Sequence, residues 1–174
     1  LDDFSEINIA GPGFINFRFS TKIYQKLIIN ILNSNKKYGS NNKSESYNIE
    51  FVSANPTGPM HVGHSRGAIF GDVLANLLIF NGNTVVKEYY INDYGNQIIN
   101  FTESVFYRLR EIKLNEKFPK KDNLYPGEYV IDIAKNILKD HNNIVLNDFN
   151  KIFNMLSQES LKHSMNLIKV DLKA

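Results

Sequence analysis

The order of patterns between residues 47 and 91 constrains the fold of this chain more than any other feature. A strand-like run at 47–53 leads into a loop with two prolines, which cannot continue a central strand. A helix is predicted from about His61 to Asn81-Gly82, and a second strand over 84–91. The apolar face of that helix comprises Ile69, Phe70, Val73, Leu74, Leu77 and Leu78. This order predicts a right-handed βαβ unit with parallel strands, and therefore an α/β fold class.

Further elements are predicted on both sides of this unit. Apolar and polar residues alternate over 14–19, which is typical of a half-buried strand, and a Gly11-Pro12-Gly13 turn precedes it. Ser20 or Thr21 can cap a helix that runs to about Lys37. The Asn/Ser/Lys-rich residues 40–46 indicate a linker and a domain boundary. Three more helices are predicted, over 98–112, 129–139 and 149–167.

Composition narrows the class of protein. The absence of cysteine excludes disulfides, thiolate metal sites and a cysteine nucleophile. A net charge of +2 is too small to indicate nucleic-acid binding, and we interpret Lys113, Lys117, Lys120 and Lys121 as a solvated face. No run approaches the ~20 apolar residues of a membrane span. The first residues do not resemble a signal peptide and include no Met, so we expect the natural chain to begin earlier.

The segment Asn55-Pro56-Thr57-Gly58-Pro59-Met60-His61-Val62-Gly63-His64 carries the most specific chemical pattern. A loop between a strand and a helix presents backbone N–H groups and the positive helix end, which together favour anions. Gly58 and Gly63 would let a nucleotide approach the backbone, while imidazoles three residues apart could contact one phosphate group. This pattern indicates nucleotidyl transfer by positioning and electrostatics. Two alternatives remain: the histidines could cap the helix, or they could form a weak zinc site, although we predict no metal site.

These residues resemble the first ATP-binding motif of class I aminoacyl-tRNA synthetases, and the run 50–64 is similar to the arginyl-tRNA synthetases in particular. Arg66-Gly67, Gly71-Asp72 and the segment 89–97 extend the resemblance, which covers nearly the whole chain. It implies a partial Rossmann-type core with a helical insertion, after a remnant of an N-terminal α+β domain. The implied domains are 1–20, the end of the tRNA-binding domain; 21–46, a connecting helix and linker; and 47–174, the partial catalytic domain.

The resemblance also implies roles for individual residues. His61 and His64 would be catalytic, holding the phosphates of ATP and stabilising the transition state. The implied ATP-binding residues are Thr57, Gly58, Pro59, His61, Gly63 and His64. The implied arginine-binding residues are Glu50, Ser53, Asn55 and His61, and Asp93 and Gln97 match a segment near the pocket.

Some of these residues have plainer interpretations. Glu50 could be a solvated strand residue, although a carboxylate suits a guanidinium well. Asp93 could cap the helix that follows it, and Arg66 could be a surface residue of the first helical turn.

The implied parent enzyme is an arginine-tRNA ligase that uses ATP with Mg²⁺, acts on arginine and its tRNA, and is assisted by tRNA in the first step. It would be cytoplasmic and monomeric, with no membrane partner. No segment matches the family's second, lysine- and serine-containing motif, so we expect a fragment that binds ATP weakly and does not charge tRNA by itself. Two alternatives are another nucleotidyltransferase of the superfamily and a non-catalytic tRNA-binding paralogue.

Overall fold

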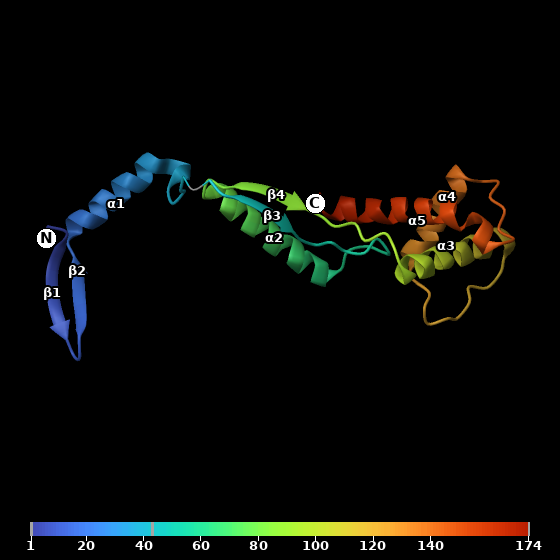
Figure 1. Ribbon diagram of the computed structural model, residues 1–174, viewed down its shortest axis with the longest axis horizontal. Helices are drawn as coiled ribbons and strands as arrows, with labels where there is room; N and C mark the ends of the chain where they lie inside the picture. Colours follow the sequence, from blue (N-terminus) through green and yellow to red (C-terminus); the bar gives the residue numbers. More distant parts are fainter. Residues whose placement is uncertain (1, 43, 174) are drawn as a thin grey trace. The chain divides into compact units, whose positions relative to one another are not determined.

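The computed structural model describes residues 2–42 and 44–173 (Figure 1). Residue contacts divide the chain into two compact units, one formed by the residues up to 47 with 76–84, and the other by 48–75 and 85 onwards. The elements, in chain order, are β1 (Phe4–Ala10), β2 (Phe14–Phe19), α1 (Thr21–Ser34), the 3-10 helix η1 (Asn35–Lys37), β3 (Ser46–Glu50), α2 (Val62–Phe80), β4 (Thr84–Glu88), α3 (Asn96–Leu114), α4 (Glu128–Asp140) and α5 (Phe149–Asp171).

The first unit begins with an antiparallel hairpin of β1 and β2, closed by glycines at φ +59° and +93°. Strand β2 confirms the strand predicted over 14–19, but the predicted half-burial is wrong, because all its residues are exposed. No second layer covers either face of this hairpin within the described residues, so alternation alone does not bury a face. Helix α1 starts after Ser20 as predicted, and η1 carries the turn to Lys37. The Ser20 hydroxyl donates to the Asp2 carbonyl instead of capping the helix.

Strands β3 and β4 form a two-stranded sheet. Thr84 N donates to Glu45 O near one end and Phe51 N donates to Glu88 O near the other, so the strands run parallel, as predicted. Both strands end earlier than predicted, at Glu50 and Glu88.

Helix α2 confirms the predicted helix, and Gly82 follows it at φ +88°, where Gly82 N donates to Ile79 O. The buried residues of α2 are the small ones, Gly71 and Ala75. A Cβ at Gly71 would overlap the ring of Phe51, so the missing side chain allows the helix and the chain after β3 to approach closely. The predicted apolar face of this helix is largely exposed, with Phe70 71% and Leu77 56% accessible.

Helices α3, α4 and α5 pack against one another and contain the main core of the described residues (Figure 1). They confirm the three predicted helices, and α5 continues to Asp171. The fully buried core side chains include Phe101, Val105, Leu109, Val130, Ile137 and Leu156. No helix in the described ranges has the length and apolar character needed to cross a membrane. The mixture of helices with a parallel strand pair agrees with the predicted α/β class.

Candidate active site

The loop between β3 and α2 starts with strained backbone. Val52 has φ +66° and Ser53 has φ +41°, and the Ser53 N–H donates to Phe51 O at 2.9 Å across a three-residue turn. Positive φ is unfavourable for a β-branched residue, and strain of this kind costs about 1–3 kcal/mol. The turn ends β3 early and directs the following residues away from the strand.

Two tyrosine hydroxyls hold the next part of the loop. The Tyr89 hydroxyl donates to Ala54 O at 2.6 Å, and the Tyr129 hydroxyl, from the first turn of α4, donates to Thr57 O at 2.9 Å. Pro56, between these two anchors, is fully buried. Burial raises the pKa of Tyr89, and burial together with Tyr125 raises the pKa of Tyr129 to about 12. Both hydroxyls therefore stay protonated and able to donate at neutral pH.

His61 and His64 form a stacked pair at the start of α2, with ring centroids 3.7 Å apart and planes inclined by 19°. His64 Nδ1 accepts the His61 N–H at 3.3 Å, and His61 Nδ1 accepts the Gly63 N–H at 3.1 Å. An accepting Nδ1 carries no hydrogen in the neutral ring, so the hydrogen lies on Nε2 in both rings. A Cβ at Gly63 would lie 3.0 Å from the His61 ring, so glycine gives this ring its space.

This arrangement modifies the predicted anion site. The sequence predicted free backbone N–H groups at the start of the helix, but the imidazoles occupy those of His61 and Gly63. Helix capping and ligand contact are therefore compatible, because capping uses Nδ1 and leaves Nε2. Burial, and then the charge of neighbouring His61, lower the pKa of His64. His64 is consequently neutral at pH 7 and can donate a hydrogen bond from Nε2.

A cavity of about 400 Å³ lies beside the histidine pair. Six residues of the motif line this cavity: Asn55, Thr57, Gly58, Pro59, His61 and His64. Two tyrosines complete the lining, Tyr125 from the segment before α4 and Tyr129 from the first turn of α4. A larger, mostly apolar cavity of about 870 Å³ beside α2 contains none of the predicted site residues, so its size does not make it the better candidate. The smaller cavity brings together the residues predicted to contact ATP, except for Gly63.

The residues predicted to contact arginine lie along the same loop. The Ser53 hydroxyl donates to Glu50 Oε1 at 2.6 Å and accepts the Tyr90 N–H at 3.1 Å. Asn92 Nδ2 donates to Asn55 Oδ1 at 3.0 Å, and Asn55 Nδ2 donates to Gln97 Oε1 at 2.6 Å. The chain after β4 therefore fixes the side chains of Ser53 and Asn55. Glu50 and Ser53 do not line the cavity of the histidine pair.

Two of the remaining predicted residues take no part in these contacts. Asp93 is exposed, and the N-cap of α3 is Gly95 with no side-chain hydrogen bond, so the capping interpretation of Asp93 is wrong. Arg66 is exposed in the first turns of α2, as a surface residue would be.

The sequence missed Asn92, Tyr125 and Tyr129 as site residues. Asn92 could have been found, because it belongs to the segment that resembles the family. The tyrosines lie about 70 residues from the motif and have no local signal.

Comparisons with known proteins agree with these features. A family model described as tRNA synthetases class I (R), catalytic domain, matches residues 27–114. An arginine–tRNA ligase of Pelagibacter ubique (strain HTCC1062) is 54% identical over 95% of this chain, and one of Ehrlichia ruminantium (strain Welgevonden) is 47% identical over 99%. A crystal structure described as an arginyl-tRNA synthetase from Campylobacter jejuni superposes with a TM-score of 0.77 at 34% identity, over 89% of this chain and 34% of that one.

The matched regions correspond to 29% and 30% of the lengths of the two curated relatives. The family model covers half of the chain, and it includes β3, the motif loop, the histidine pair and α2. This chain therefore belongs to the family of class I (R) tRNA synthetase catalytic domains.

Proposed function

We propose that the protein carrying this chain is an arginine-tRNA ligase, which activates arginine with ATP and transfers it to tRNA. Membership of the family and the names of the curated relatives support this proposal. The observation that carries it is the stacked His61–His64 pair, with both Nδ1 atoms occupied, on the wall of a cavity built by the motif. We place the activity in the cytoplasm, where translation occurs, and propose a monomer.

ATP would occupy the cavity beside the histidine pair. Nε2 of His61 and His64 would donate to phosphate oxygens, and these bonds strengthen as negative charge develops on the α-phosphate. Gly58 and Pro59 would face the nucleotide, and Gly63 would leave space beneath the adenine. No carboxylate among the described residues lines this cavity, so Mg²⁺ would enter with ATP as part of the substrate, held by phosphate oxygens.

Arginine would lie along Glu50, Ser53 and Asn55. The Glu50 carboxylate suits the planar guanidinium, which donates two parallel hydrogen bonds to such a group. Asn55 would contact the α-amino end of arginine. Its orientation depends on Asn92 and Gln97, which hold both ends of its amide. Asp93 remains a peripheral candidate because it is exposed in the same segment.

The reaction would proceed in two displacements. A carboxylate oxygen of arginine attacks the α-phosphorus of ATP, the bond to the bridging oxygen breaks, and pyrophosphate leaves. A hydroxyl of the terminal tRNA ribose then attacks the carbonyl carbon of the adenylate, and AMP leaves. Neither displacement requires a covalent bond to the protein, so positioning and charge stabilisation supply the rate enhancement.

The direct test is arginine-dependent exchange of pyrophosphate into ATP, measured on the full-length protein with and without tRNA. We expect exchange with arginine and none with lysine or ornithine, and we expect Glu50→Gln to raise the KM for arginine more than that for ATP. Exchange that depends on another carboxylate or on no amino acid would indicate a different nucleotidyltransferase. Tight tRNA binding without exchange, unchanged by His61→Ala and His64→Ala, would indicate a binding paralogue.

A further inference from the structure

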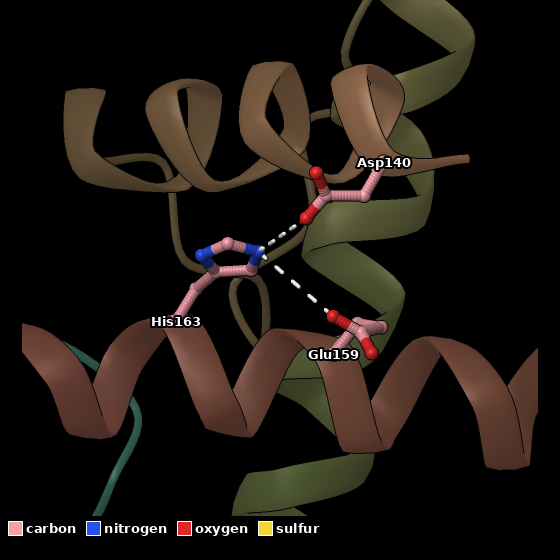
Figure 2. A group of neighbouring side chains, drawn as sticks. All are labelled: Asp140, Glu159 and His163. Carbon is pink, nitrogen blue, oxygen red and sulfur yellow. Dashed lines mark ion pairs between the residues drawn. The ribbon is translucent and has the colours of Figure 1, made fainter. Parts of the chain in front are cut away.

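A second group of chemically active side chains lies outside the cavity of the histidine pair, where α4 ends against α5. Asp140 is the last residue of α4, while Glu159 and His163 are four residues apart on α5. Figure 2 shows the three side chains pointing toward one another, with His163 facing both carboxylates. One ligand atom from each residue lies within 4.8 Å of the other two.

His163 has an unusual environment. Its Nε2 atom is buried and has no hydrogen-bond partner within the described residues. Asp140 Oδ2 and Glu159 Oε2 each lie 4.0 Å from it, which is beyond hydrogen-bond distance. A buried polar nitrogen without a partner is costly, so its position between two carboxylates requires an explanation.

The two distances from His163 Nε2 are close to those that a shared metal ion would require, and the two carboxylates lie within 4.8 Å of each other. Zinc–nitrogen and zinc–oxygen bonds of about 2.0–2.2 Å place the ligand atoms of a tetrahedral site about 3.3–3.6 Å apart. The two 4.0 Å separations would have to shorten by about half an ångström, which side-chain rotation can supply. His141 Nε2 lies 3.9 Å from the other oxygen of Glu159, Oε1, and does not belong to this group of ligand atoms, so water would complete the coordination.

The donor set selects the kind of ion. Imidazole nitrogen with carboxylate oxygen suits Zn²⁺ and neighbouring divalent transition metals, whereas Mg²⁺ and Ca²⁺ prefer oxygen alone. Lys162 opposes the ion, because its Nζ bonds Glu159 Oε2 at 2.9 Å. Its side chain is 65% exposed and can turn into solvent.

We propose that Asp140, Glu159 and His163 form a binding site for a divalent transition-metal ion, with Zn²⁺ as its natural probe. The ion would join the end of α4 to the middle of α5. Tyr129, which holds the motif loop, lies on α4 about 17 Å along the helix axis from Asp140. An ion there would hold the helix on which the loop anchor depends.

The test is zinc binding to the full-length protein, measured by competition with a chelating dye and by thermal unfolding with added ZnCl₂. We expect His163→Gln and Glu159→Gln each to weaken binding by at least about tenfold, since even indirect ligand partners contribute 10–100-fold. Saturating zinc should raise the melting temperature of the parent protein and not that of His163→Gln. His61→Gln is the matched control, which removes an imidazole outside the cluster and should keep this binding.

Two further measurements decide between a metal site and an ion pair. Co²⁺ should give visible d–d absorption that His163→Gln abolishes, and Lys162→Met should tighten zinc binding by removing the competing ammonium. Equal zinc affinity in the parent and in His163→Gln would overturn the proposal. The proposal would also be overturned if His163→Gln lowered the melting temperature by the same amount with and without zinc, because direct contacts among the three side chains would then explain the arrangement.

Discussion

His61 and His64 stack face to face with centroids 3.7 Å apart, and each ring accepts a backbone N–H at Nδ1. The two rings therefore share one tautomer and keep their Nε2 hydrogens for a ligand. Burial, and then the charge of neighbouring His61, lower the pKa of His64 and disfavour its charged ring. This relationship leads to predictions about the identity of the donating nitrogen and about its pH dependence.

The first prediction separates the two nitrogens of His64. The side-chain nitrogen of glutamine can occupy the place of Nε2, while that of asparagine occupies the place of Nδ1. We expect His64→Asn to lower kcat for arginine-dependent pyrophosphate exchange by about 10²–10³-fold, as for loss of a transition-state donor. His64→Gln should retain more activity. Equal losses in the two variants, with unchanged circular dichroism, would contradict the assignment of Nε2.

A second prediction concerns protons taken up with ATP. The pKa of His64 is lowered in the free protein, and a bound polyphosphate would raise it by favouring the charged ring. Binding should therefore take up protons, and affinity should rise as the pH falls from the bound-state pKa toward the free-state pKa. Calorimetry of MgATP binding in buffers with different ionisation enthalpies measures this uptake. The same titration of His64→Gln measures the protons that the nucleotide itself takes up. An uptake unchanged by this substitution would rule out His64 as the group that is protonated.

The third prediction tests the anchor between α4 and the motif loop. Tyr129→Phe removes the donor to Thr57 O but keeps the ring against Gly58, where a Cβ would lie 3.1 Å away. We expect a loss of about 1 kcal/mol in stability and a higher KM for ATP, because Thr57 and Gly58 line the cavity. Tyr89→Phe removes the corresponding bond to Ala54 O and should have a smaller effect on ATP. Equal effects on KM would show that the loop responds as a whole.

The fourth prediction compares two glycines within α2. A Cβ at Gly71 would overlap the Phe51 ring, whereas one at Gly67 would meet no described residue within 4 Å beyond its own stretch of helix. Gly71→Ala should destabilise the protein by about 1–3 kcal/mol through overpacking. Gly67→Ala should stabilise it by about 0.5–1 kcal/mol, because alanine is the better helix former. Urea unfolding of both variants gives the two signs, and a stable Gly71→Ala would mean that Phe51 can move aside without cost.

The sequence predicted the order of elements from β2 onwards, whereas β1 was not predicted. Helices α2, α3, α4 and α5 form where apolar spacing predicted them, and Gly82 ends α2 at positive φ. Such features are local, because helix periodicity and glycine conformation depend on neighbouring residues. The motif from Asn55 to His64 was also visible without a structure, since its specificity lies in residue type and spacing. Those same residues largely define the cavity wall.

Tertiary structure decided which residues meet that motif. Tyr129 reaches Thr57 across 72 residues, and Gln97 reaches Asn55 across 42, so no local pattern could pair them. The same applies to Asp140, which meets His163 only because the end of α4 packs against α5. The apolar face of α2 shows the converse error. The spacing of its residues predicted that this face is buried, but it is largely exposed in the described residues. Periodicity determines which face of an element is apolar, but only packing decides what covers that face and which side chains converge there.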